Sequence, residues 1–219
     1  MIGRDKGAGK LKLDLHTHCF EAMDAVPDQE SVQAIVEAVR RKGLDGIAIT
    51  EHSSMKFGLQ AKEIVDRYLD GAIIIIPGRE IMDRGQEIVE LFLPQGSIFR
   101  FLAHPTSLSP YYPFDDNLHG IEIENYSHNA AINQEVVRRV AEENDLLLFR
   151  NSDAHSLLEV GALYNEIELE ELNRAVVNQK LLTLRRTLDW FDEELKKRDK
   201  IIHELLKENF ELREAKNEG

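Results

Sequence analysis

The stretch DLHTHCFEA, residues 14–22, decides how this chain is interpreted. It puts His16 and His18 two residues apart at the end of an apolar strand, KLKLDLH. Residues i and i+2 of a strand lie on the same face, so the two imidazoles can share a partner, and the commonest such partner is a metal ion. Two histidines do not complete a metal site, so the other ligands have to come from later parts of the chain.

The rest of the sequence alternates short apolar strands with amphipathic helices. Apolar runs predict further strands at DGIAIT, AIIIIPGREI, EIVELFLP, FRFLAHP, GIEIEN and LLLFRN. Helical spacing, basic residues in the last turn and a terminal glycine predict a helix over residues 31–43, and a second helix is predicted over residues 130–144. This alternation indicates an α/β fold with a mostly parallel sheet or barrel.

Polar side chains that can bind metal follow most of these strands. Six of the eight histidines lie just past an apolar strand, and this is the edge at which α/β barrels build their sites. Each short motif is weak evidence alone, but their joint occurrence in order predicts a metal centre. The residues at these strand ends are His16, His18, Glu51, His52, Glu80, His104, Glu124, Asn125, His128, Asp153 and His155.

The ordered motifs DLHTH, TEH, PGRE, AHP, IEIEN and NSDAH resemble the PHP superfamily, the polymerase and histidinol phosphatase domains. The resemblance spans residue 11 to about residue 168. It implies a distorted seven-stranded β/α barrel that holds two or three divalent metal ions at its C-terminal face, and an activity in phosphoester hydrolysis. Mixed imidazole and carboxylate ligands suit zinc, manganese or iron and do not distinguish among them.

The resemblance also implies an assignment of ligands to three metal positions. The first would be held by His16, His18, Glu80 and Asp153. Glu80 would bridge to a second metal held by His104 and His128, with Asn125 as the alternative to His128. A third would be held by His52, His155 and an acid of the first loop, for which Asp24 is favoured over Glu21. The family usually has Asp-His where this chain has Glu51-His52, and His52 is expected to be the ligand.

Catalysis would then combine metal-activated water with groups that handle protons and phosphate charge. Asp153 and His155 are the candidate catalytic residues. Arginine forks suit phosphate, so Arg79, Arg84 and Arg150 are candidates for substrate binding. For Arg79 and Arg150, a structural ion pair is the equal alternative. Cys19 is interpreted as a small buried residue and not as a nucleophile.

Composition limits the partners and the compartment. The chain has 219 residues, 42% of them hydrophobic, and a net charge of −13. That charge argues against a long nucleic acid or an anionic membrane surface as a partner, but not against a small phosphorylated substrate. A single cysteine fits a reducing compartment, and neither a membrane span nor a signal peptide is evident. We therefore expect a cytoplasmic protein.

The last fifty residues differ in character. Neither Gly nor Pro occurs between Glu170 and the final Gly219. A 3-then-4 apolar repeat predicts a coiled-coil-like helix, so we divide the chain into a metal-binding barrel, residues 1–169, and a helical extension, residues 170–219. The helix implies a partner, most simply a second copy of the chain in a homodimer. A helix folded back on its own domain is the alternative. The repeat comprises Leu181, Leu184, Leu188, Phe191, Leu195, Ile202, Leu205 and Leu212, interrupted by Arg198 and Asn209.

The leading hypothesis is a metal-dependent phosphoesterase that acts on a small phosphorylated metabolite, nucleotide or short oligonucleotide. One alternative is a metallohydrolase that cleaves a bond other than a phosphoester. The other is a metal-stabilised assembly protein that acts through its C-terminal helix. The aromatic residues Tyr111, Tyr112 and Phe114 would either stack on a substrate ring or pack their loop onto the barrel.

Overall fold

The computed structural model describes residues 9–24, 26–106, 108 and 117–217, with side chains up to residue 208. Tyr111, Tyr112 and Phe114 lie outside the described residues, and so do the side chains of Asn209 and Leu212. The predicted roles of these five residues therefore stay predictions.

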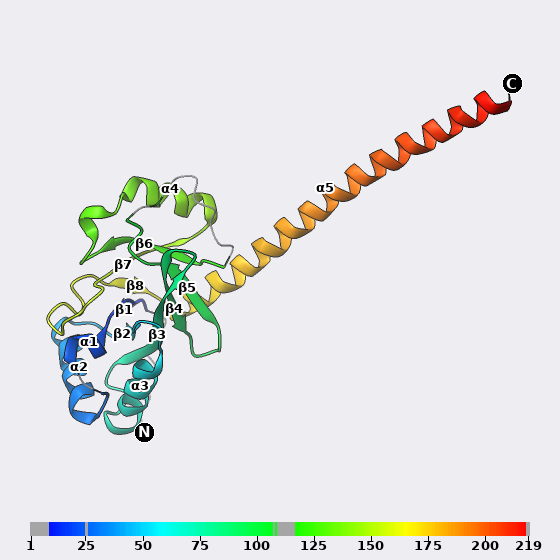
Figure 1. The fold of residues 1–219 in the computed structure, drawn as a ribbon. Coiled ribbons are helices and arrows are strands. Elements are labelled where there is room, and N and C mark those ends of the chain that lie inside the picture. Colours follow the sequence, from blue (N-terminus) through cyan, green and yellow to red (C-terminus); the bar gives the residue numbers. More distant parts are fainter. Residues whose placement is uncertain (1–8, 25, 107, 109–116, 218–219) are drawn as a thin grey trace. The chain divides into compact units, whose positions relative to one another are not determined.

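A single mixed sheet of eight strands forms the frame of the domain (Figure 1), in the order β7-β6-β5-β4-β3-β2-β1-β8. The neighbours β1/β2, β2/β3, β5/β6 and β6/β7 are parallel, while β4 and β8 run antiparallel to their neighbours. The strands are β1 Leu11–Asp14, β2 Gly46–Ile49, β3 Ile74–Asp83, β4 Gln86–Phe92, β5 Ile98–Leu102, β6 Gly120–Asn125, β7 Leu147–Asn151 and β8 Asn165–Ile167.

The α/β class is confirmed, but the prediction of seven strands was wrong. The additional strand, β8, has only three residues, too few to produce a period-2 pattern in the sequence. It pairs antiparallel with β1 and lies across from β7. The side chain of Asn165 joins these two edges: its Oδ1 accepts the N–H of Arg150 at 2.9 Å, and its Nδ2 donates to the carbonyl of Arg150 at 3.0 Å. One amide side chain thus nearly closes the sheet into a barrel.

Alternation along the strands separates an inner core from outer cores. On β2, Ala48 belongs to the inner cluster with Phe99, Phe101 and Phe149, whereas Ile47 and Ile49 belong to an outer cluster. This is the period of two expected for strands covered on both faces. The apolar faces of the helices complete the outer cores, one against β2 and β3 and another against β6.

Helices cover the barrel in the part of the chain that the structure describes. They are α1 Cys19–Met23, α2 Gln29–Arg41, α3 Lys56–Tyr68 and α4 Gln134–Asn144, with a 3-10 turn η1 at Asn129–Ala131. A capping box starts α2, because the Asp28 carboxylate accepts the N–H of Ser31 and the Ser31 hydroxyl accepts the N–H of Asp28. Figure 1 shows α3 beside β3 and α4 beside β6.

The last helix, α5 Leu169–Asn217, has 49 residues, so the long C-terminal helix is confirmed. Its first turns bury Leu172 and Val176 in the inner cluster of the barrel. Because β8 ends opposite Leu11, α5 starts at the end of the barrel remote from His16. The chain divides into two compact units at Gln179 and Lys180. Across the described residues, no helix is both long enough and apolar enough to cross a membrane.

The role of Asn165 can be tested by Asn165→Ala. Loss of the hydrogen bonds between β7 and β8 leaves backbone groups of Arg150 without partners and should lower the free energy of unfolding by about 1–3 kcal/mol. Urea unfolding followed by circular dichroism measures this change. Asn178→Ala, at an exposed position of α5, is the matched control and should have almost no effect. Equal stability of the two variants would contradict the closure role.

Candidate metal centre

Backbone pairing continues beyond the ends of the strands and brings the motifs together. Past β1, the N–H of His18 donates to the carbonyl of Ala154 at 2.8 Å, and the N–H of Asp153 donates to the carbonyl of His16 at 2.9 Å. The HTH segment is thus held against the segment that follows β7. On the other side, His52 and Glu80 form an isolated parallel bridge. Motifs separated by more than a hundred residues therefore meet at one end of the barrel.

Asp14 holds the HTH segment in this position. Its buried carboxylate accepts the N–H of Ser152 at 3.1 Å and the N–H of Gly161 at 2.9 Å, and it also accepts the hydroxyl of Ser152. Burial raises the pKa of Asp14 to about 6, against the lowering effect of these hydrogen bonds. A single carboxylate therefore ties the end of β1 to the loop that carries Asp153.

Four buried side chains meet at the centre of the site. The Nε2 atoms of His16 and His18 lie 3.1 Å apart. The carboxylate of Asp153 lies 3.1 Å from His18 Nε2 and 3.4 Å from His16 Nε2. Glu80 places its two oxygens 3.4 Å and 3.6 Å from the same two nitrogens. The four predicted ligands of the first metal are thus brought together, with all their ligand atoms directed at one point.

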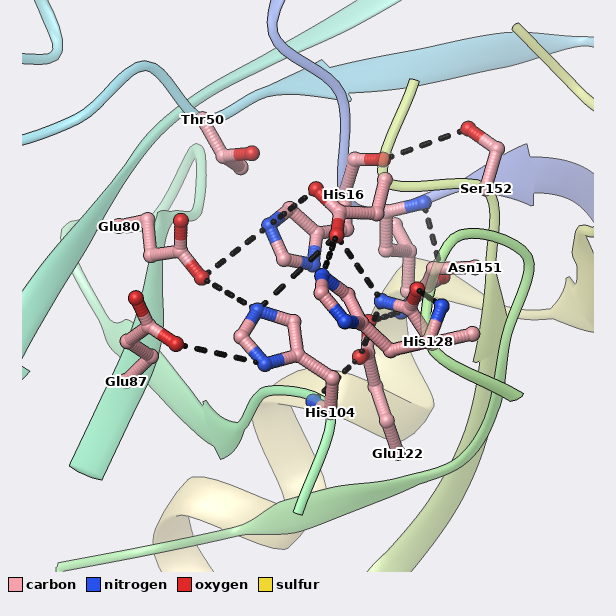
Figure 2. A network of polar contacts seen from close by, with 12 residues as sticks. His16, Thr50, Glu80, Glu87, His104, Glu122, His128, Asn151 and Ser152 are labelled. Carbon is pink, nitrogen blue, oxygen red and sulfur yellow. Dashed lines mark hydrogen bonds and ion pairs between the residues drawn. The ribbon is translucent and has the colours of Figure 1, made fainter. Parts of the chain in front are cut away.

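Glu122 determines which nitrogen of His16 faces this point (Figure 2). The buried carboxylate of Glu122 lies 3.0 Å from Nδ1 of His16 and can only accept a hydrogen bond while it is ionised. The ring therefore carries a proton on Nδ1, and its Nε2 lone pair is directed at the oxygens of Glu80 and Asp153. A nitrogen lone pair directed at carboxylate oxygens is favourable only if a cation, either a proton or a metal ion, lies between the nitrogen and the oxygens.

The electrostatics of the metal-free chain agree with this requirement. Burial alone would lower the pKa of His16, but the carboxylates of Glu122, Glu80 and Asp153 hold it well above the usual value. Burial would likewise raise the pKa of Glu80 and Asp153, but the neighbouring imidazoles keep the pKa of both well below their usual range. Both carboxylates stay ionised, as metal ligands must be.

Three further groups of ligand atoms surround the centre. In each group, one atom of every member lies within 4.8 Å of the others. His104 approaches Glu80 at 3.2 Å and Asp153 at 4.0 Å, so Glu80 is placed to bridge two positions. The groups, together with the one already described, are His16 with His18 and Glu80; His16 with His104 and Asp153; Glu80 with Glu87 and His104; and His18 with Glu21, His52 and His155.

This donor set fits divalent metal ions. Its members are imidazole nitrogens and carboxylate oxygens, which suit zinc, manganese or iron. Nδ1 of His18 is a buried polar atom without a hydrogen-bond partner among the described residues, which is unusual for a histidine that only fills a core. The Nδ1 of His155 lies 2.9 Å from the carbonyl of Asp153, so it carries the proton and leaves Nε2 for a ligand.

Of the two acids of the first loop, Glu21 and not the favoured Asp24 lies beside the imidazoles of the site. Glu21 lies 3.3 Å from His52 Nε2 and 3.4 Å from His155 Nε2. Asp24 instead ends α1 in the left-handed conformation, with φ 48°, and is exposed. The six-residue spacing from His18 puts Asp24 just past the last residue of α1, whereas Glu21 lies within the helix and faces His52 and His155.

Of the two candidates after β6, His128 has the position of a ligand. Its Nε2 lies 3.6 Å from Asp153 Oδ2, and its ring lies 4.6 Å from that of His104. Asn125 is buried and uses its amide to donate to Glu122 at 2.9 Å and to Asp153 at 3.3 Å. Asn125 therefore positions carboxylates of the site, while its Oδ1, the atom through which an asparagine binds metal, accepts the N–H of Ser127 and the N–H of His128 at 3.0 Å each.

The sequence interpretation missed two acids and an amide. Glu122 accepts hydrogen bonds from the His104 N–H at 2.7 Å and from the Asn151 side chain at 2.8 Å, in addition to its contact with His16. Glu87 lies 3.4 Å from His104 Nδ1, as Figure 2 shows. The available signal was an acid in the middle of the apolar strand GIEIEN, where a charge is costly unless it is paired. Glu87 gave no such signal.

The structure does not bring the three predicted arginines to the centre. Arg79 precedes Glu80 on β3 and so lies on the other face of the strand, where it pairs with Glu90 at 2.7 Å. Arg150 pairs with Glu124 at 2.6 Å and lines a separate cavity of about 680 Å³ beside β7 and β8. Arg84 lies in the turn between β3 and β4, with φ 50°. For Arg79 and Arg150 the structural alternative is the one that the geometry supports.

Cys19 also has the structural role that was expected. It is fully buried, and burial raises the pKa of its thiol far above the usual value. A thiol that stays protonated is a poor nucleophile. Two members of the centre have strained backbones instead: φ is 53° at Asp153 and 21° at His104. Such strain is concentrated at functional sites.

Comparison with known proteins supports the resemblance to the PHP superfamily. Residues 132–182 match the family model described as PHP-associated. The uncharacterized protein MJ1587 of Methanocaldococcus jannaschii is 25% identical over 61% of this chain and 93% of its own length. The fold is similar to that of a suggested metal-dependent phosphoesterase from Bifidobacterium adolescentis, with a TM-score of 0.54 and 13% identity over 76% of this chain and 96% of that protein. The structural likeness at this identity concerns the fold.

The part played by Glu122 can be tested by Glu122→Gln. Loss of the charge that fixes His16 should weaken the binding of Mn²⁺ or Zn²⁺ about 10- to 100-fold, measured by competition with a chromophoric chelator. Glu124→Gln is the matched control, because Glu124 lies on the same strand but pairs with Arg150. An affinity lowered equally in both variants would contradict the role of Glu122.

The choice between the two acids of the first loop can be tested by metal content. We expect Glu21→Gln to lose metal from the group formed with His52 and His155, because a carboxamide is a weaker ligand than a carboxylate. Asp24→Asn should keep the content of the native chain. Elemental analysis after dialysis against Zn²⁺ measures both. The reverse result would restore Asp24 as the ligand.

Proposed function

We propose that the chain is a metal-dependent hydrolase of phosphoester bonds in a small phosphorylated metabolite, nucleotide or short oligonucleotide, a proposal that the PHP-associated family match over residues 132–182 supports. The observation that carries the proposal is the convergence of five imidazoles and four carboxylates in overlapping groups at the end of the barrel. The histidines are His16, His18, His52, His104 and His155, and the acids are Glu21, Glu80, Glu87 and Asp153.

The charge of the site explains why the reaction would need metal. Glu80, Asp153 and Glu122 are all ionised and nearly fully buried, so an anionic substrate would be repelled from the metal-free centre. When bound, divalent metal ions would neutralise phosphoryl charge and lower the pKa of a water molecule. The metals therefore have to supply the attraction that the predicted arginines do not.

The protein groups supply position and proton handling. Asn125 and the imidazoles hold the carboxylate of Asp153, and Glu122 holds the ring of His16. The side chain of His155 is 43% exposed, and the contact of its Nδ1 with the Asp153 carbonyl leaves Nε2 directed at the site. This geometry supports His155 Nε2 as a metal ligand or, where no metal takes it, as a group that accepts a proton and later donates it to a leaving group.

One observation favours a second candidate function. Phosphate-binding arginines were the reason for preferring phosphoesters over other bonds, and Arg79 and Arg150 are held by glutamates on the outer face instead. Hydrolysis of an amide by the same centre is therefore the alternative. The nearly complete set of ligands argues against a role restricted to assembly, because a purely structural barrel has no need for it.

The proposal can be tested by measuring phosphate release, with Mn²⁺ added, from three substrates: histidinol phosphate, a nucleoside 3′,5′-bisphosphate and a dinucleotide. The products of the dinucleotide reaction are treated with a phosphatase before phosphate is measured. We expect release by the native chain, its loss with EDTA and its return with Mn²⁺. Asp153→Ala should lower the rate at least about 100-fold. Asp66→Asn, which removes an exposed carboxylate of α3, should leave the rate unchanged.

The same samples decide between the candidates. N-acyl amino acids, assayed in parallel for release of the free amine, report on amide hydrolysis. Amine release without phosphate release would favour the second candidate. Silence in both assays from a chain with measured bound metal would contradict the enzymatic proposal.

A further inference from the structure

The part of α5 that belongs to the second compact unit carries an apolar stripe. From Leu181 to Leu205 the apolar residues of the predicted repeat are 51% to 65% exposed. Most of the stability of a helix in a protein comes from packing of its apolar face, and a long exposed apolar surface marks a site of association. We propose that the α5 helices of two copies of this chain pair in parallel and in register, from residue 181 to residue 206, as a two-stranded coiled coil.

The repeat is complementary to a second copy of itself. In heptad notation the a positions are Leu181, Leu188, Leu195 and Ile202, and the d positions are Leu184, Phe191, Arg198 and Leu205. Side chains at a and d insert between those of a facing helix with the same spacing. We call these eight residues the seam. A seam that recurs every 3.5 residues over four heptads fits another helix with the same repeat better than a globular surface.

The residues beside the seam favour a parallel arrangement. Ile201 at position g and Leu206 at position e are apolar and are 55% and 64% exposed. In a parallel, in-register pair, g lies beside the e position five residues later on the other helix, so Ile201 meets the partner's Leu206. In an antiparallel pair, g positions face g positions and e positions face e positions. The other g positions are Lys180, Thr187 and Glu194, and the other e positions are Arg185, Asp192 and Asp199. Of the two arrangements, only the parallel register places Ile201 of one helix against Leu206 of the other.

The polar residue of the seam also finds partners in this register. Glu194 at g and the partner's Asp199 at e would repel each other if nothing lay between them. Arg198 occupies the d layer directly between these two positions. Two arginines, one from each copy, therefore lie within a ring of four carboxylates. A polar residue at a seam position that is satisfied in only one alignment specifies that alignment.

The first experiment measures the mass of the full chain at about 50 μM by sedimentation equilibrium. We expect twice the 25.1 kDa of the chain, and a fall to 25.1 kDa in Leu188→Asp and Leu195→Asp. These side chains are exposed in the single chain, so the barrel should stay folded. Trp190→Asp, an exposed aromatic residue outside the seam, is the matched control and should stay dimeric. A monomeric native chain, or seam variants of unchanged mass, would overturn the proposal.

The second experiment tests direction and register by single cysteines. In a parallel, in-register pair, Leu184→Cys and Leu205→Cys should each form a disulfide-linked dimer on mild oxidation, because each position meets its own copy. The two positions are about 32 Å apart along the helix, so an antiparallel pair can cross-link at one of them at most. Lys200→Cys faces away from the seam and should stay unlinked. Native Cys19 is buried, and the unmodified chain is the background. Cross-linking at only one seam position, or at neither, would overturn the parallel arrangement.

A charge-reversal substitution tests independently whether the two α5 helices run parallel. The parallel register puts Lys180 beside the partner's Arg185, an unfavourable pair. Arg185→Glu should therefore lower the Kd of the dimer about threefold or more, while Arg186→Glu on the outer face of the helix should leave it unchanged. A weaker dimer in Arg185→Glu would contradict the parallel register, because Arg185 would then face an acid. The inference does not depend on the proposed hydrolase activity.

Discussion

The metal centre depends on one interaction, the contact between the buried Glu122 carboxylate and Nδ1 of His16. It directs the His16 lone pair at Glu80 and Asp153, so that imidazole and carboxylate groups share a small buried volume. The carboxylates hold the pKa of His16 well above its usual value. A metal ion bound at this point would compete with a proton for the same lone pair.

The barrel provides the rigidity that such a centre requires. His16, Asp153, His52 and Glu80 are fixed by backbone hydrogen bonds that extend the strand pairing past the strands themselves. Asp14 adds a buried link from β1 to the loop after β7. The ligands therefore keep their positions without metal, even where the backbone is strained, as at Asp153. The anionic centre on the inside and the arginine–glutamate pairs on the outer face are separated by the alternation of the strands.

Hydrolysis and assembly would use different parts of the chain. The candidate ligands all lie in the first compact unit, and the exposed seam lies in the second. The seam residues have no role in binding metal, and the ligands have none in pairing helices. A substitution in one part should therefore leave the chemistry of the other unchanged.

The sequence by itself determined the α/β class, the long C-terminal helix and the set of strand-end histidines, because these depend on local periodicity and on motif order. The tertiary structure decided what depends on facing directions and on distant partners. It placed Glu21 and not Asp24 beside His52 and His155, showed the unpredicted Glu122 and Glu87, and placed Arg79 on the outer face. One residue along a strand reverses the face of a side chain, and Asp24 lies past the last residue of α1 in a left-handed conformation. It also added β8, whose three residues are too short for a pattern and are held by pairing with β1.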